Sequence, residues 1–166
     1  MKKCGCKCEI HDIDKPEVQW IPSPNFSARA AVPLDTIVMH YTASDNIKGV
    51  IDWFSRKASQ VSAHYVIGKD GGIVQMVKDS DKAWHAGKHN SRSIGIENVA
   101  KGEDRLTVEQ KKALVELTRY LCHTHNIPRE NIKGHRYLDG ASTDCPGHIF
   151  DPVEKNVVEK WVEKNI

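Results

Sequence analysis

The sequence contains no apolar run that approaches the roughly 18 residues needed to cross a bilayer, so a membrane-spanning protein is not expected. Two lysines follow Met1, but no apolar segment follows them, which argues against a secretory signal and makes cytoplasmic synthesis the default. Neither sign of charge dominates, because the formal net charge is +2 and no long run of one sign occurs. Nucleic acid and membranes are therefore not expected as partners.

A disulfide framework is also missing, because the five cysteines are unevenly spread along the chain. Cys4, Cys6 and Cys8 fall in a polar stretch at the N-terminus. They could bind a soft metal ion, but we favour a flexible tail with reactive thiols. Cys122 falls on the apolar face of a predicted helix and is interpreted as a core residue, whereas Cys145 needs a separate explanation.

The residues that are present suffice for one domain. Of the 166 residues, 39% are hydrophobic, so the chain can bury a core without disulfides. Residues 1–19 are polar and lack a periodic pattern, which predicts a flexible, cysteine-containing tail. Residues 20–166 are predicted to form the domain, without an internal repeat. Its first part, residues 20–29, contains two prolines and is predicted to be an extended arm anchored by Trp20 and Phe26.

Strands and helices are predicted to alternate along the domain. Strands are expected at 35–42, 62–67, 72–77, 93–99 and, more briefly, 131–135. Helices are expected after Asp45 or Asn46, from the capping box Thr107–Gln110 to about His125, and from Asp151 and Pro152. Asp70-Gly71 between two apolar strands indicates a hairpin. The prediction is an α/β fold, a single three-layer domain with a central mixed β-sheet flanked by about three helices.

The glycine-rich segment 134–147 carries a histidine and a cysteine ten residues apart, His135 and Cys145. The first predicted strand ends at His40, and ligand sites in α/β sheets gather at the carboxyl ends of strands. Two imidazoles and one thiolate suit zinc and leave a fourth position for water. Judged on residue chemistry alone, a buried structural cysteine and a loop histidine explain the pattern about equally well.

Four other titratable residues are candidates for chemistry. Glu97 follows an apolar strand, where burial would raise its pKa and suit it to general base catalysis. A solvated glutamate at a strand end is the alternative. His64 lies within a predicted strand and is expected to be packed and hydrogen-bonded rather than a metal ligand. His85 and His89 lie in an irregular loop and could line a cleft.

Seven short segments in a fixed order carry a resemblance to a known family: Val38–Ala43, Val61–Ile67, Lys69–Gly71, Ala83–Gly87, Ile94–Glu97, Gly134–Arg136 and Asp144–Gly147. The chain resembles the zinc-dependent N-acetylmuramoyl-L-alanine amidases, which include phage lysozyme-type amidases, peptidoglycan recognition proteins and anhydro-muropeptide amidases. The resemblance implies one zinc ion held by His40, His135 and Cys145. It also implies hydrolysis of the amide bond between N-acetylmuramic acid and L-alanine, in peptidoglycan or soluble muropeptides.

The resemblance further implies roles for individual residues. Glu97 matches the catalytic glutamate of the anhydro-muropeptide branch. Thr143 stands where that branch has a lysine, and its hydroxyl is expected to help stabilise the oxyanion. Ala63 stands where the phage branch and the recognition proteins have a catalytic tyrosine. Three further residues are expected to contact the substrate: Trp84, His85 and Asn98.

The main alternative is a peptidoglycan-binding recognition module without catalysis. Such binders typically lack the cysteine ligand, which this chain keeps at Cys145. A structural zinc domain would need four closed ligands, and a good fourth ligand is not evident. We expect a monomer that acts on peptidoglycan or muropeptides, without nucleic acid or membrane partners. Release or export by other machinery could bring an endolysin-like enzyme of this kind to the cell wall.

Overall fold

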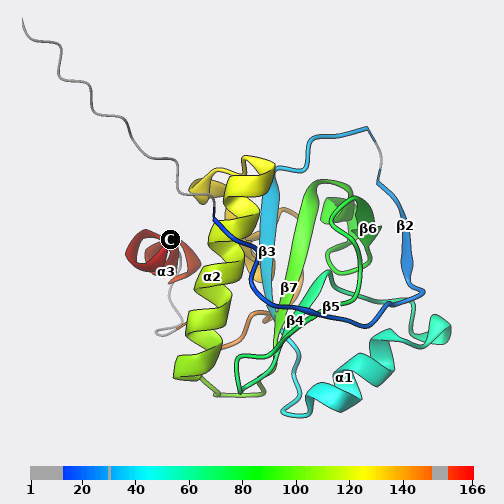
Figure 1. Cartoon of the computed structure of the whole chain (residues 1–166), viewed down its shortest axis with the longest axis horizontal. Helices are drawn as coiled ribbons and strands as arrows, with labels where there is room; N and C mark the ends of the chain where they lie inside the picture. Colours follow the sequence, from blue (N-terminus) through cyan, green and yellow to red (C-terminus); the bar gives the residue numbers. More distant parts are fainter. Residues whose placement is uncertain (1–12, 30, 151–156) are drawn as a thin grey trace, which may run out of the picture.

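A computed structural model describes residues 13–29, 31–150 and 157–166 of the chain (Figure 1). Residues 1–12, which include the three tail cysteines, lie outside the described residues. The predicted start of the last helix at Asp151 lies outside them as well. Figure 1 shows the strands and helices of the described residues.

A six-stranded mixed sheet forms the centre of the molecule, with the strand order β1-β5-β4-β7-β3-β8. Its strands are β1 (Gln19–Trp20), β3 (Thr36–Tyr41), β4 (Tyr65–Ile67), β5 (Ile73–Gln75), β7 (Ser93–Asn98) and β8 (Ile132–Gly134). β3 lies between two parallel partners, β7 and β8, as its continuous apolar run predicts. β4 and β5 form the predicted antiparallel hairpin, in which Gly71 adopts a φ of 84°.

Three helices cover the two faces of the sheet: α1 (Ile47–Phe54), α2 (Val108–His125) and α3 (Val157–Asn165). Figure 1 shows α2 and α3 side by side, with α1 away from both. Because side chains alternate along a strand, one face packs on each helix layer. Ile96 packs with Leu117 of α2 in one core cluster, and Val66 packs with Phe54 of α1 in the other. The predicted three-layer α/β domain is confirmed.

The helix starts that were predicted from capping residues lie where expected. Asn46 is the N-cap of α1, and its side chain accepts a hydrogen bond from Gly49 N. Thr107 and Gln110 form the predicted capping box of α2. The described chain also has four 3₁₀ helices: η1 (Lys57–Ser59), η2 (Gly87–Arg92), η3 (Arg129–Asn131) and η4 (His135–Tyr137). Within the described residues, no helix has the length and apolar character to span a bilayer.

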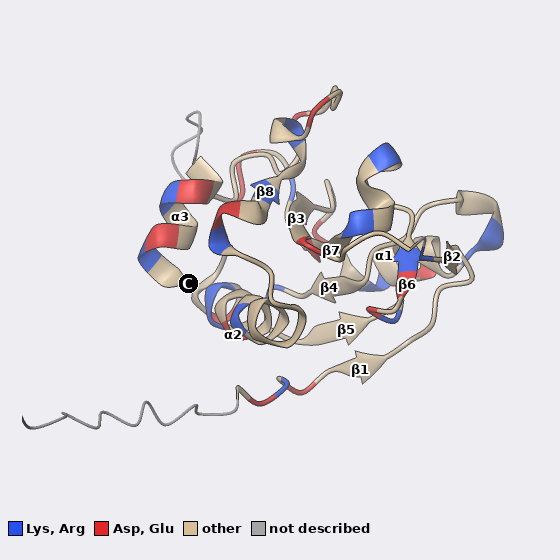
Figure 2. Ribbon diagram, turned by 90° about the horizontal axis from the view of Figure 1, so that it is seen from above, with Lys and Arg blue, Asp and Glu red and all other residues tan. Residues whose placement is uncertain are grey.

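Lys and Arg residues and Asp and Glu residues both occur along the described chain (Figure 2). Figure 2 shows acidic and basic residues interspersed along α3. The mixture agrees with the small net charge of +2 read from the sequence.

The arm before β3 is extended, as predicted, but its anchors are polar rather than aromatic. Trp20 is 48% exposed and Phe26 is 46% exposed, so the prediction that they anchor the arm is wrong. The buried residues of the arm are Ser23 and Asn25. Ser23 Oγ donates to Phe54 O at 2.5 Å, and Asn25 Nδ2 lies 3.2 Å from the same oxygen. Small polar side chains fit here because the carbonyls at the end of α1 need donors.

The arm also adds strands to the molecule. β1 pairs in parallel with β5, so Gln19, the last residue of the predicted tail, already belongs to the sheet. Before it, Lys15 Nζ donates to Gln75 Oε1 at 2.9 Å. Further along, β2 (Phe26–Ala28) pairs with β6 (Asp81–Ala83) in a separate two-stranded sheet. The arm therefore ends beside the loop that precedes β7, close to the candidate site.

Candidate metal and catalytic site

Three side chains meet at the carboxyl ends of β3 and β8. His40 lies in β3, His135 begins η4 directly after β8, and Cys145 lies in the loop that follows. Their candidate ligand atoms all lie within 4.8 Å of one another. Cys145 Sγ is 3.4 Å from His40 Nδ1, and the two imidazole centroids are 4.6 Å apart. Because β3 and β8 are parallel neighbours, their carboxyl ends reach the same edge of the sheet.

Backbone hydrogen bonds fix the loop that carries the thiol. Arg136 N donates to Cys145 O at 2.7 Å, and Cys145 N donates to Thr143 Oγ1 at 3.1 Å. Tyr41 N points at the sulfur from β3, with an N–S distance of 3.4 Å. The thiol is thereby held against the end of β3 from two directions.

The donor set fits a soft divalent cation. Burial lowers the pKa of His40 well below its ordinary value and also lowers the pKa of His135, so both imidazoles stay neutral, the form that coordinates metals. Burial, and then the charge of Glu97, raises the pKa of the Cys145 thiol. A thiolate at this position therefore needs a nearby cation, and zinc supplies that charge when a thiolate and two imidazoles bind it.

Glu97 lies beside this cluster, on the strand next to His40. The two residues are in register between β3 and β7, so their side chains leave the same face of the sheet. Burial raises the pKa of Glu97 to about 8. Its Oε2 atom is buried and has no hydrogen-bond partner among the described residues. A buried carboxyl oxygen without a partner is costly, which makes Glu97 a candidate for a functional role.

One cavity adjoins Glu97 and another adjoins His135. One, of about 290 Å³, is lined by Glu97 together with Thr42, Ser44 and the half-exposed Trp53. The other, of about 330 Å³, lies beside His135, between η2 and residues 138–142. Glu97 therefore lines one cavity, and the candidate metal ligand His135 lines the other.

Polar contacts connect the two sides of the second cavity, η2 and residues 138–142. The sequence did not indicate these contacts. Lys88 Nζ lies 2.5 Å from Asp139 Oδ2, and His89 Nε2 lies 2.9 Å from Asp139 O. His89 lines this cavity together with His135. The expectation that His89 lies in a cleft agrees with this placement, whereas nothing in the sequence pairs residues that are 51 positions apart.

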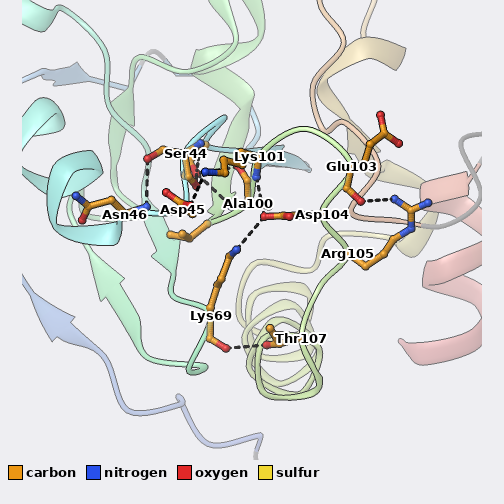
Figure 3. A network of polar contacts seen from close by, with 12 residues as sticks. Ser44, Asp45, Asn46, Lys69, Ala100, Lys101, Glu103, Asp104, Arg105 and Thr107 are labelled. Carbon is orange, nitrogen blue, oxygen red and sulfur yellow. Dashed lines mark hydrogen bonds and ion pairs between the residues drawn. The ribbon is translucent and has the colours of Figure 1, made fainter.

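A second polar network holds the loop after β7 near the cavity of Glu97 (Figure 3). Lys69 Nζ lies 2.8 Å from Asp104 Oδ2, and Lys101 Nζ lies 2.6 Å from Asp45 Oδ2. Ser44, which lines that cavity, donates its backbone N–H to Ala100 O at 3.0 Å. Each exposed ion pair contributes little on its own, but together they join the hairpin turn, the start of α1 and the loop before α2.

The three residues expected to contact substrate occupy different surroundings. Trp84 Nε1 donates to Ser27 Oγ at 3.1 Å, so its ring is turned toward the arm. Asn98 is fully buried, and its Nδ2 donates to His40 O at 2.9 Å. Its position offers nothing to a substrate, because alternation along β7 turns it away from the face that carries Glu97. The imidazole of His85 is turned inward, with Nδ1 3.0 Å from His40 Nε2.

The two remaining candidates are His64 and Thr143. His64 agrees with its sequence interpretation, and Thr143 is accessible. His64 is fully buried, and its Nδ1 accepts a hydrogen bond from Gly95 N at 2.9 Å, as a packed histidine should. Thr143 is exposed in the loop before Cys145. Its accessibility leaves the hydroxyl available to a bound substrate.

Known proteins are similar to this chain in sequence and in fold. Residues 30–148 match the family described as N-acetylmuramoyl-L-alanine amidase. The chain is 35% identical over 160 residues to N-acetylmuramoyl-L-alanine amidase A of Achromobacter lyticus, covering 83% of this chain and 90% of that protein. It is 31% identical over 173 residues to the 1,6-anhydro-N-acetylmuramyl-L-alanine amidase AmpD of Haemophilus influenzae, covering 86% of this chain and 94% of that protein.

The fold of this chain is also similar to that of a solved amidase structure. The N-acetylmuramoyl-L-alanine amidase LysC of Clostridium intestinale has a TM-score of 0.70 and 25% identity, covering 90% of this chain and 97% of the other. The matched region of the family reaches from the end of the arm to the loop after Cys145, and so contains the whole candidate metal cluster and Glu97. The chain therefore belongs to the N-acetylmuramoyl-L-alanine amidase family.

Proposed function

We propose that the protein is a zinc-dependent amidase that cleaves the bond between N-acetylmuramic acid and the L-alanine of the stem peptide, in peptidoglycan or muropeptides. The observation that carries the proposal is the meeting of His40, His135 and Cys145 next to the unpartnered carboxyl group of Glu97. Family membership supports the amidase reaction. A carboxyl group with a raised pKa beside the metal candidates favours an enzyme over a module that only binds the wall.

His40, His135 and Cys145 would hold one zinc ion through two neutral imidazoles and a thiolate. Bound zinc would supply Lewis acidity toward the scissile carbonyl and lower the pKa of a water molecule. The described residues provide three ligands here, which suits a catalytic site because a structural site closes all four positions. Two imidazoles and a thiolate are the donor types that zinc prefers, which supports this choice of metal.

Glu97 would move the proton. A carboxyl group with a pKa near 8 accepts and returns a proton easily around neutral pH. In the proposed reaction it takes a proton from the attacking water and then gives it to the nitrogen of the departing L-alanine. The same side chain thus serves first as general base and then as general acid.

Thr143 would assist at the developing oxyanion. Its Oγ1 accepts the hydrogen bond from Cys145 N, which uses a lone pair and leaves the hydroxyl proton available to donate. A hydroxyl donor aimed at an oxyanion stabilises the transition state more than the ground state. This assignment depends on the substrate approaching from the exposed side of the loop.

The test combines metal analysis with product detection. The purified protein should contain one zinc ion per chain and should release stem peptides with a free L-alanine amino group from purified sacculi or from soluble anhydro-muropeptides. Bound zinc without peptide release from either substrate would favour a wall-binding recognition module. A protein that folds but takes up no zinc would overturn the proposal.

A further inference from the structure

His85 lies directly behind the candidate ligand His40. It follows β6 and precedes η2, and its Nδ1 atom is 3.0 Å from His40 Nε2. The two rings meet edge to face, with centroids 5.1 Å apart. The opposite nitrogen of His40, Nδ1, faces the sulfur of Cys145 at 3.4 Å. His40 therefore has one nitrogen toward the metal cluster and the other toward His85.

The direction of each hydrogen bond follows from Ser93. Ser93 Oγ lies 2.8 Å from His89 O, and since a carbonyl cannot donate, the hydroxyl proton belongs to this bond. Ser93 Oγ must then accept from His85 Nε2, which is 3.2 Å away. A neutral His85 that carries its proton on Nε2 has a free lone pair on Nδ1. His40 Nε2 donates to that lone pair, so His40 Nδ1 is left unprotonated, as a metal ligand must be.

The backbone around His85 is shaped to hold the ring in this position. A Cβ atom at Gly95 of β7 would lie 2.6 Å from His85 Cγ and from His85 Nδ1, so only glycine leaves room for the imidazole. On the other side, Asn90 Oδ1 accepts from His85 N at 3.1 Å and from Ala86 N at 2.6 Å. Ring and backbone are thus both fixed, which reduces the entropy cost of keeping the ring in place.

We infer that His85 is a positioning residue for the metal site, which holds His40 in the tautomer and orientation that present Nδ1 to the ion. The inference rests on the proposed function, since it assumes that zinc binds at His40. It replaces the expectation that His85 contacts the substrate. Groups that accept a hydrogen bond from a metal-binding histidine fix its ring and raise its basicity, and removing them typically weakens metal binding by about ten- to a hundred-fold.

The test compares three variants of the full chain by chelator competition for zinc. His85→Ala should weaken zinc binding by about ten- to a hundred-fold. His85→Asn keeps an acceptor close to the position of Nδ1 and should restore most of the affinity. His123→Ala, an exposed histidine of α2, is the matched control and should bind zinc like the parent protein. The cobalt-substituted His85→Ala protein should also show a shifted visible absorption spectrum, whereas the other two variants should not.

Tautomers can be read directly from long-range proton–nitrogen correlations of the imidazole rings. In the parent protein His85 should carry its proton on Nε2 both with and without zinc. An Nδ1 proton on His85, or a His85→Ala variant with parental zinc affinity and cobalt spectrum, would overturn the inference. If His85→Ala does not fold, Ser93→Ala decides, because it removes the hydroxyl that accepts from His85 Nε2 and leaves the imidazole of His85 in place. Several-fold weaker zinc binding by that variant supports the inference, and unchanged binding contradicts it.

The outcomes separate this inference from the proposed function. A parent protein that binds no zinc defeats the proposed function. A parent protein that binds zinc and cleaves muropeptides, with His85 variants that bind zinc equally well, defeats only the positioning role. The readout is metal affinity and spectrum, neither of which depends on turnover.

Discussion

Glu97 is a residue whose chemistry depends on where the fold places it. Replacing it with Gln keeps the shape of the side chain but removes its ability to accept a proton. We expect Glu97→Gln to lower kcat by about a hundred-fold or more, because general base catalysis typically contributes that much. Zinc content should be unchanged. The measurements are stem-peptide release and metal analysis on the same preparation.

A matched control uses the same chemical change elsewhere. Glu103 lies 3.1 Å from His148 and is 80% exposed, so Glu103→Gln should keep parental activity. Near-normal turnover by Glu97→Gln would show that another group moves the proton. Equal losses in both variants would indicate a general effect of the lost charge.

His64 shows how a buried histidine connects stability to pH. Burial lowers its pKa from 6.5 to about 4. Protonation would also put a proton on Nδ1, which already accepts from Gly95 N. The unfolded chain binds this proton below about pH 6.5 and the folded protein only below about pH 4, so stability is lost as the pH falls between these values.

The expected size of this effect is testable in the metal-free protein. His64→Asn keeps an acceptor for Gly95 N but cannot take up a proton. Between pH 7 and pH 5 the parent protein should lose roughly 2 kcal/mol more unfolding free energy than the variant does. Urea denaturation at the two pH values measures the difference. Parallel losses in the two proteins would mean that His64 titrates normally in the folded state.

Among the elements, the arm depends on Arg29. Its guanidinium donates to backbone carbonyls on three segments, including Asp81 O at 2.7 Å and Ser91 O at 2.8 Å. Arg29→Lys keeps the charge but loses the planar fork, so we expect a loss of roughly 3 kcal/mol in unfolding free energy. Hydrogen exchange of the β2 amides should become faster. Chemical denaturation and exchange measurements test the two effects.

The control for this change is Arg92→Lys. Arg92 makes an ion pair with Asp35, but its side chain is 54% exposed. An exposed pair contributes little, so this variant should lose much less stability than Arg29→Lys does. Similar losses in both variants would contradict the anchoring role of Arg29.

The elements themselves could be predicted to a large extent from the sequence. Continuous apolar runs predicted β3 and β7, and side-chain capping predicted the starts of α1 and α2. The anchors of the arm could not be predicted, because hydrophobicity indicates Trp20 and Phe26, whereas the arm is held by polar groups that meet carbonyls far along the chain.

Some features of the site could also be predicted from the sequence, and others could not. His40 and Cys145 could be found from their positions after a strand and on a rigid turn. The pairing of His40 with His85 could not, because it joins residues 45 positions apart through an irregular loop. Asn98 was expected to contact substrate, but it is fully buried, on the face of the strand opposite to its neighbour Glu97. Strand alternation, which was available from the sequence, already places neighbours on opposite faces.

At the scale of the whole molecule, bound zinc should stabilise the fold. A ligand that binds only the folded state adds about 4 kcal/mol when its free concentration is a thousand times its Kd. We therefore expect a chelator to lower Tm and added zinc to restore it. Cys145→Ser should lose both the zinc and the response. Differential scanning calorimetry with and without chelator measures the shift.

Cys122 supplies the control for the thiol. It is a partly buried free cysteine of α2, and burial raises its pKa to about 11. Cys122→Ser should keep the zinc content and the Tm response of the parent protein. If Cys122→Ser loses zinc as Cys145→Ser does, the ion is not held where the cluster indicates.

His40 and Cys145 are 105 positions apart, and His40 lies in β3, which pairs with both β7 and β8. An ion held between them would act as a cross-link across most of the domain, whose two described cysteines are both free thiols. A covalent link around a loop of this length restricts the unfolded chain by roughly 4 to 5 kcal/mol. Unlike a disulfide, this link would be insensitive to reducing agents and would respond instead to the supply of zinc.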